Sequence, residues 1–199
     1  MDKDLESIQE SRQLVDAAYT AWKAFELYSE DQVERILKAI SDAGVKHASS
    51  LAKLAVEETG FGNVADKTAK NLFGARDVYE AMRPLRTIGI IRQDHEKKVM
   101  EVACPVGVIA GIVPSTNPTS TTVYKALIAL KGRNVVVFSP HPSAAGCVNE
   151  AVRVIAAAAE AAGAPPNVIS SMRMPTLQAT EELMRNPKTA LILATGGPG

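Results

Sequence analysis

The chain has 199 residues, of which 46% are hydrophobic and 22% charged, and its formal net charge is +0 at pH 7. This size and composition provide one good hydrophobic core, or about one and a half typical domains. The neutral charge balance argues against non-specific nucleic-acid binding, which needs clustered Lys and Arg, and against a polybasic membrane-surface protein.

The N-terminus and the cysteine content indicate a cytoplasmic protein. The opening segment MDKDLESIQESRQ is polar and acidic, unlike a secretory signal, and no run of about 18 apolar residues predicts a membrane span. The two cysteines, Cys104 and Cys147, are too few for a disulfide framework. We therefore expect a cytoplasmic location, and enclosure in a protein shell or assembly into a filament stays an open alternative.

The first part of the chain is predicted to be helical. Residues 3–28 place apolar side chains at every third or fourth position, which predicts an amphipathic helix. Ser29 and Gln32 have the spacing of a capping box, which begins a second helix. That helix runs to about Glu58, and Gly44 is a candidate interruption.

A third helix is predicted over residues 64–82, and Pro84 ends it. We interpret residues 1–84 as a helical segment that packs on the rest of the chain, with assembly through its first helix as the alternative. Glu57 and Glu58 are interpreted as a solvated helix end.

Residues 85–104 are predicted to form a β-hairpin. Residues 87–91 and 99–102 are typical of two short strands, and the segment between them is polar. An exposed hairpin is suited to pair with the sheet of another subunit, as an oligomerisation arm. A local meander is an equally good interpretation.

Residues 105–199 alternate strands and helices. The predicted strands are 106–113, 134–138, 168–172 and 190–194, and the helices between them are 119–131, 143–162 and 176–185. Continuous apolar runs rich in β-branched residues are typical of strands covered on both faces of a parallel sheet. The order βαβαβαβ predicts a right-handed, doubly wound, Rossmann-like α/β sheet.

The last predicted strand, 190–194, runs directly into Thr195-Gly196-Gly197-Pro198-Gly199. In a doubly wound sheet such a turn normally leads into a helix that covers the strand, and no helix follows here. We therefore expect the sheet to be incomplete and the chain to be truncated.

Four segments follow the predicted strands, at the edge where open parallel sheets bind their ligands. They are residues 114–118, 139–142, 173–175 and 195–199. The first is rich in hydroxyl and amide groups, and the amides of the glycine-rich last segment can approach a phosphate closely. Neither a G-x-G-x-x-G motif nor a Walker motif is present, so the residues alone leave a nucleotide site and ordinary turns as equal alternatives.

Other chemically active side chains give weaker indications. Cys104 precedes Pro105 in an extended segment and Cys147 falls within a predicted helix, so neither is expected to be a nucleophile. We interpret His141 as a hydrogen-bonding or ring-packing residue of its turn. No group of His, Cys, Asp and Glu has metal-ligand spacing, so no metal site is predicted.

Several motifs resemble the aldehyde dehydrogenase superfamily. They are IVPSTNPTSTTVYKALIALKGRN, FSPHP, AAGAPPNVI, LILATGGPG and, nearer the N-terminus, AVEETGFGNVADKTAKN. The resemblance covers essentially the whole chain and is to the acylating branch, especially the N-terminal half of bifunctional aldehyde–alcohol dehydrogenases. It implies an enzyme, usually a homo-oligomer, that reversibly converts a short-chain aldehyde, NAD and coenzyme A to acyl-CoA and NADH.

In this family a cysteine thiolate attacks the aldehyde, the adduct gives hydride to NAD, and coenzyme A takes the acyl group. Asn117 resembles the asparagine whose side-chain amide stabilises the oxyanion. The cofactor-binding residues implied by the resemblance are Ile112, Val113, Pro114, Ser115, Thr116 and Asn117 along the nicotinamide and ribose, Ser139, Pro140, His141 and Pro142 near the adenosine, and Thr195, Gly196 and Gly197 at the pyrophosphate.

The sequence departs from ordinary aldehyde dehydrogenases in two ways. Ser139 and Pro142 stand where those enzymes often carry a lysine and a glutamate that hold the adenine ribose, which leaves both NAD and NADP open. This departure suits the acylating branch, in which the same pocket receives coenzyme A. The family's nucleophilic cysteine lies beyond Gly199, and neither Cys104 nor Cys147 matches it.

We therefore expect this piece alone to be inactive. The alternative is a naturally truncated protein that binds nucleotide, or assembles with other subunits, without catalysis.

Overall fold

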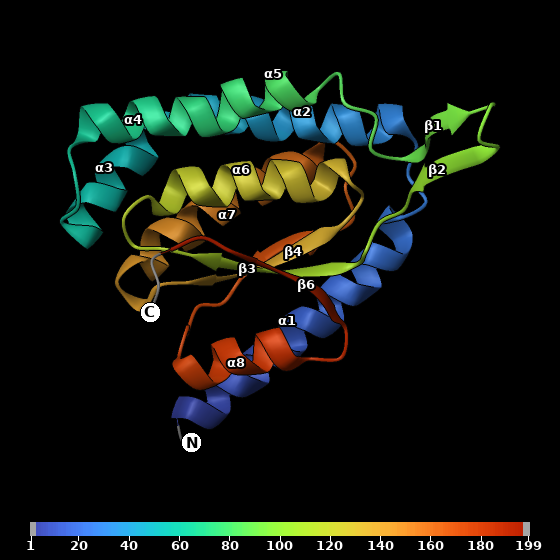
Figure 1. Cartoon of the computed structure of the whole chain (residues 1–199). Coiled ribbons are helices and arrows are strands. Elements are labelled where there is room, and N and C mark those ends of the chain that lie inside the picture. The colour runs from blue at the N-terminus through green and yellow to red at the C-terminus, as the bar shows by residue number, and fades with distance from the viewer. Residues whose placement is uncertain (1–2, 197–199) are drawn as a thin grey trace.

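The computed structural model describes residues 3–196, which form four stacked layers (Figure 1). One face of a sheet is covered by α1 (Lys3–Phe25) and α8 (Leu177–Arg185). The other face is covered by α6 (Pro118–Lys131) and α7 (Ala145–Ala161). An outer layer packs over α6 and α7 and consists of α2 (Glu30–Lys46), α3 (Ala48–Thr59), α4 (Val64–Leu72) and α5 (Val78–Met82).

The main sheet is parallel, with the strand order β5-β4-β3-β6. Its strands are β3 (Val108–Val113), β4 (Val135–Pro140), β5 (Ile169–Ser171) and β6 (Thr189–Ala194). The chain moves from β3 outward to β4 and β5, and then crosses to the opposite side of β3 to form β6. The strand order therefore reverses at β3, and the predicted doubly wound α/β sheet is confirmed.

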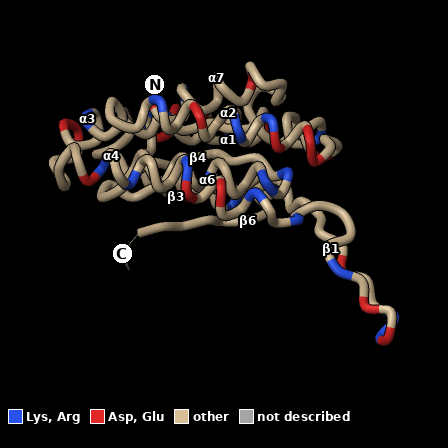
Figure 2. The backbone as a smooth tube through the Cα atoms, turned by 90° about the horizontal axis from the view of Figure 1, so that it is seen from above, with Lys and Arg blue, Asp and Glu red and all other residues tan. Residues whose placement is uncertain are grey.

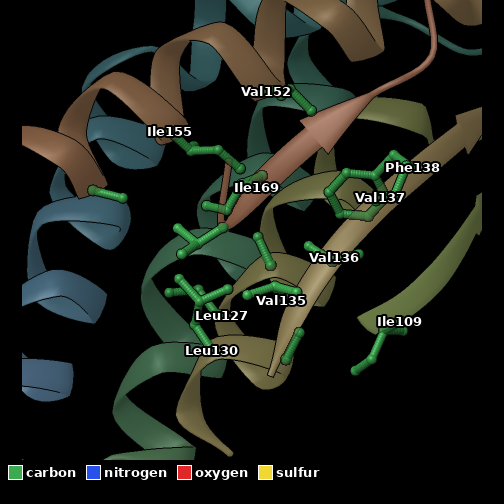
Figure 3. Close-up of a cluster of buried hydrophobic side chains, with 14 of the residues drawn as sticks. Ile109, Leu127, Leu130, Val135, Val136, Val137, Phe138, Val152, Ile155 and Ile169 are labelled. Carbon is green, nitrogen blue, oxygen red and sulfur yellow. The ribbon is translucent and has the colours of Figure 1, made fainter. Parts of the chain in front are cut away.

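The core lies on both sides of β4, every residue of which is buried. Figure 3 shows side chains of β4 packed with those of α6, α7 and the neighbouring strands. The β-branched residues that predicted this strand fill the space between sheet and helices, as in other parallel sheets. The labelled members are Ile109, Leu127, Leu130, Val135, Val136, Val137, Phe138, Val152, Ile155 and Ile169.

The apolar run 190–194 is typical of a strand covered on both faces, but β6 is covered only in part, in line with the expectation of an incomplete sheet. This strand lies at the edge of the sheet, and Leu191 and Ile192 are 46% and 48% exposed. Among residues 3–196 no strand pairs with its outer edge, and α8 makes the helical contact with it. Apolarity predicted a strand here correctly, but which strand lies at an edge depends on the strand order.

The predicted helix over residues 3–28 is confirmed as α1, which ends at Phe25. It buries Val15, Ala18 and Phe25 completely in the same core as the sheet. The Glu10 carboxylate accepts hydrogen bonds from the backbone amide of Arg173 at 2.9 Å and from that of Met174 at 3.0 Å. Within residues 3–196 no helix is long and apolar enough to cross a membrane.

The capping box that begins α2 is confirmed. The Ser29 hydroxyl accepts from the amide of Gln32 at 3.2 Å, and the Gln32 side chain accepts from the amide of Ser29 at 2.8 Å. The interruption proposed at Gly44 is wrong, because α2 continues through it to Lys46. The helix is interrupted at His47 instead, and α3 begins at Ala48. A Cβ atom at Gly44 would lie 2.7 Å from the Cβ atom of Ala75, so this glycine permits close helix packing.

The helix predicted over residues 64–82 is present, with a π-helical segment, Phe73–Asp77, between α4 and α5. In this segment a Cβ atom at Gly74 would meet the backbone oxygen of Ser120 at 3.0 Å. The π-helical turn therefore packs closely against α6.

The predicted hairpin is confirmed as β1 (Gly89–Asp94) and β2 (Val99–Ala103), which pair antiparallel. The Asp94 carboxylate accepts from two backbone amides of the turn. Figure 2 shows the hairpin projecting from the body of the molecule. Large apolar side chains on it are about half exposed, and they are Ile90, Ile91, Val99, Met100 and Val102.

Glu58 is exposed near the end of α3, as expected, but its carboxylate also contacts another helix. Its two carboxylate oxygens accept from the backbone amide of Gly146 at 2.8 Å and from that of Cys147 at 2.6 Å, in the first turn of α7. The first amides of a helix have no partner within the helix, and a carboxylate there also meets the positive end of the helix dipole. A residue 88 positions away in sequence thus caps α7.

Replacing Glu58 by alanine is expected to lower the free energy of unfolding by about 1 kcal/mol, the usual effect of removing a helix cap. Glu57→Ala is the matched control, because Glu57 makes a surface ion pair with Lys53 at 3.8 Å and should change stability little. Urea denaturation of both variants measures the difference. Equal losses in the two variants would contradict the capping role.

Candidate functional site

A cleft of about 850 Å³ opens at the carboxyl ends of β3, β4 and β6. Three of the four predicted segments meet there, through residues 112–117, 139–142 and 195–196. Every predicted site residue in the described part of the chain lines this cleft, and Gly197 lies outside the described residues. The strand order explains this, since the crevice of a doubly wound sheet forms beside the strand at which the order reverses.

The fourth predicted segment, 173–175, is only partly in the cleft. Pro175 lines it, whereas Arg173 lines a separate hollow between α1 and α7. Glu10 holds the amides of Arg173 and Met174 against α1, which turns this part of the segment away. The cleft wall includes further residues that the sequence did not single out, namely Thr121, Thr176, Leu177 and Thr180.

Neutral groups form the walls of the cleft. Among the described residues that line it, none is Asp, Glu, Lys or Arg, and His141 is the only imidazole. The Ser139 hydroxyl lies 2.7 Å from that of Thr180, so the two hydroxyl groups form a hydrogen bond within the wall. A ligand would therefore be held by hydroxyl and amide groups and by the positive end of α6, which begins at the cleft.

His141 holds the turn after β4. Its Nδ1 atom lies 2.8 Å from the Ser143 hydroxyl and accepts from the Ser143 amide at 3.2 Å. The ring thus caps the short 3-10 helix Pro142–Ala144. This contact agrees with the interpretation of His141 as a hydrogen-bonding residue of the turn.

Lys125, in α6, is a buried lysine that sequence reasoning missed. It is 0% exposed, and its ammonium donates to the backbone oxygens of Ile112 and Leu193, each at 2.6 Å. It therefore fastens the ends of β3 and β6 together beneath the cleft. Burial lowers the pKa of Lys125 to about 8. A lone lysine in the apolar stretch VYKALIAL was the available signal.

Lys125 is expected to make stability depend on pH. Unfolded lysine has a pKa of about 10.4, so between pH 8 and that value the unfolded chain binds a proton that the folded chain does not. The titration of Lys125 therefore makes the free energy of unfolding rise with pH between pH 8 and about 10.4. The stability of the unmodified chain relative to Lys125→Met should therefore increase between pH 7 and about pH 10.

Urea denaturation at both pH values measures that difference. Comparison with the variant cancels the titration of all other groups. A difference that stays constant would mean that the Lys125 ammonium keeps its ordinary affinity for protons.

Neither cysteine lines the cleft. Cys147 is buried and donates to the backbone oxygen of Ala144 at 3.3 Å. Burial first, and then the hydrogen bond and charge of Glu58, raise the pKa of its thiol to about 12. A thiol is reactive only when it ionises, so Cys147 is inert at neutral pH. Within residues 3–196 no three His, Cys, Asp or Glu side chains are grouped so that they could hold a metal ion.

Comparison with known proteins decides the family. A model of the aldehyde dehydrogenase family matches residues 5–199. The chain belongs to the aldehyde dehydrogenase family. It is 40% identical over 193 residues to the bifunctional aldehyde-alcohol dehydrogenase of Escherichia coli strain K12, an alignment that covers 97% of this chain and 22% of that protein.

Solved structures agree with this assignment. An acetylating aldehyde dehydrogenase from Geobacillus thermoglucosidasius matches with a TM-score of 0.97 and 54% identity, over 100% of this chain and 44% of that one. A propionaldehyde dehydrogenase from Rhodopseudomonas palustris with bound propionyl-CoA matches with a TM-score of 0.81 and 32% identity, over 94% of this chain and 41% of that one. The resemblance to acylating aldehyde dehydrogenases is confirmed, and this aldehyde dehydrogenase chain spans less than half the length of these relatives.

Proposed function

We propose that this chain is the nucleotide-binding part of an enzyme that reversibly converts a short-chain aldehyde, NAD and coenzyme A to acyl-CoA and NADH. The observation that carries the proposal is the convergence of residues 112–117, 139–142 and 195–196 on one uncharged cleft at the strand reversal. Acylating relatives of high structural similarity support the reaction class.

In the proposed arrangement residues 112–116 lie along the nicotinamide and its ribose, and residues 139–142 lie near the adenosine. Thr195 and Gly196 contact the pyrophosphate, where a Cβ atom at Gly196 would meet no atom within 4 Å and the backbone is accessible. The Tyr124 hydroxyl lies 3.1 Å from that of Thr195 and helps to hold this turn. The cofactor supplies the hydride chemistry, and the chain supplies its position.

The Asn117 amide is proposed to stabilise the negative charge that develops on the aldehyde oxygen. Neither Cys104 nor Cys147 lines the cleft, so we infer that the nucleophile belongs to a part of the whole protein outside these residues. On this proposal the chain alone binds nucleotide and forms no NADH from aldehyde and coenzyme A.

The deciding experiment is an assay of the whole protein with acetaldehyde and NAD. NADH should form only when coenzyme A is also present. NADH formation with no need for coenzyme A would overturn the acylating assignment. The relative of Rhodopseudomonas palustris holds propionyl-CoA in its structure, which supports coenzyme A as the acyl acceptor here.

The alternative of a nucleotide-binding or assembly protein without catalysis is tested by the intact mass in the native host. A mass well above 21.1 kDa supports the enzyme, and a mass near 21.1 kDa supports the alternative.

Weak discrimination between NAD and NADP is also proposed. The described walls of the cleft offer no carboxylate to repel a 2′-phosphate and no Lys or Arg to attract it. Comparison of the KM values for the two cofactors tests this, and a preference above about 100-fold, equivalent to 2.7 kcal/mol, would contradict it.

The hairpin is proposed as an arm for homo-oligomer formation. Ile90 and Val102 are cross-strand partners, each about half exposed, and a soluble monomer gains nothing from such exposure. Replacing both residues by aspartate should lower the mass of the oligomer measured by light scattering, because charges would be buried in the apolar interface between subunits. Leu27→Asp is the control, since Leu27 is 80% exposed on another part of the surface. An unchanged mass in the hairpin variant would contradict the proposal.

A cytoplasmic location of the protein stays a prediction.

A further inference from the structure

One face of α4 contacts the loop that carries Asn117. Lys67, Lys70 and Asn71 are spaced three and four residues apart and therefore share this face. The Lys67 ammonium donates to the backbone oxygen of Thr116 at 2.7 Å, and the Lys70 ammonium donates to the Asn117 side-chain oxygen, Oδ1, at 3.1 Å. The next turn is held as well, because the Thr119 hydroxyl donates to the Asn71 side-chain oxygen at 2.8 Å.

Asn117 occupies the N-cap position of α6 but does not cap the helix. An asparagine there normally accepts a hydrogen bond from one of the first helical amides, which stabilises a helix by about 1 kcal/mol. The Asn117 side chain makes no such bond. Its oxygen accepts from Lys70 instead, so the side chain is turned away from the arrangement that its position in the helix favours.

The contact with Lys70 determines which end of the amide faces the cleft. An ammonium group can only donate, so the atom that faces Lys70 must be the oxygen. Asn117 lines the cleft, and among the described residues no acceptor binds its Nδ2 atom. The NH₂ group is therefore the part of this side chain that remains for a ligand.

We propose that Lys70 is a positioning residue, which orients and polarises the Asn117 amide so that its NH₂ group donates to the developing oxyanion. Lys67 anchors the backbone one residue before it. A positive charge at the amide oxygen draws electrons toward that oxygen and makes the NH₂ protons better donors. The inference rests on the proposed function, because it gives the proposed oxyanion donor its orientation.

The surroundings of Lys67 indicate that the contact between α4 and the Asn117 loop is well ordered. Lys67 is only 5% exposed, and burial, followed by the neighbouring charge of Lys70, lowers its pKa. The Asp66 carboxylate on the same helix binds the Asn63 side chain at 2.7 Å and leaves both ammonium groups to the loop. The two ammonium groups thus bind two different oxygen atoms of the loop, one each from Thr116 and Asn117.

The kinetic test uses the whole protein and a double-mutant cycle. Lys70→Met should lower kcat about tenfold while the KM for NAD stays nearly constant, and Lys70→Arg should retain most of the activity. In an Asn117→Ala background, Lys70→Met should lower kcat no further. Lys38→Met is the matched control, because Lys38 lies on the exposed side of α2 and pairs with Asp42 at 2.6 Å. A tenfold fall that persists without the Asn117 amide would overturn the proposal.

A second measurement needs no activity. The ¹⁵N relaxation of the Asn117 side-chain amide in this chain should show a rigid group that becomes mobile in Lys70→Met and stays rigid in Lys38→Met. An equally rigid amide in Lys70→Met would overturn the positioning role. If the amide becomes mobile but the whole protein makes no NADH from aldehyde and coenzyme A, the positioning stands and the proposed function fails.

Discussion

Replacing Asn117 by alanine is expected to lower kcat for aldehyde oxidation by the whole protein about 10²–10³-fold, the usual loss when one oxyanion donor is removed. The reason is geometric, since Asn117 lines the cleft with its oxygen held by Lys70 and its NH₂ group free to donate. On the proposed role, the Asn117 amide acts on charge that develops in the transition state, so the KM for NAD should change little. Steady-state kinetics with acetaldehyde and coenzyme A measures both quantities.

Asn186→Ala is a suitable control for this prediction. Asn186 ends α8 and accepts from the amide of Lys188 at 3.0 Å, so the variant loses a local contact without touching the cleft. It should keep its kcat. A loss of less than about tenfold in Asn117→Ala would mean that another group stabilises the oxyanion.

Replacing Gly111 by alanine is expected to lower the free energy of unfolding by about 1–3 kcal/mol, the usual effect of overfilling a packed core. Gly111 lies inside β3, and a Cβ atom there would meet the Phe138 ring at 2.6 Å and a Val136 methyl group at 3.0 Å. Both neighbours are completely buried in the next strand, so they cannot move into solvent. Urea denaturation measures the loss.

Phe138→Leu provides the compensating variant, because it removes the ring that the new methyl group meets. The double variant should lose less stability than the sum of the two single variants, by about 0.5 kcal/mol or more. Strictly additive losses would show that the contact between residues 111 and 138 does not limit this site.

Several elements could be predicted because their signals are local. The apolar run 135–138 is typical of an interior strand and is buried, and the spacing of Ser29 and Gln32 is sufficient to begin a helix. The alternation of strands and helices restricts the topology to a few right-handed arrangements. For the same reason segments 114–118, 139–142, 173–175 and 195–199 could be placed at one edge of the sheet, and among the described residues the third segment lies partly outside the cleft.

The amino-acid sequence by itself therefore determined the elements, the class of sheet and the segments that form the cleft, because periodicity and turn chemistry act over a few residues. Only the tertiary structure decided that Glu58 caps α7, that Lys125 joins β3 to β6, and that Lys70 contacts Asn117. Each of these contacts joins residues that are far apart along the chain. A hydrogen bond requires the donor–acceptor distance to be right within a few tenths of an ångström. The packing of whole layers sets that distance, and it leaves no local pattern in the sequence.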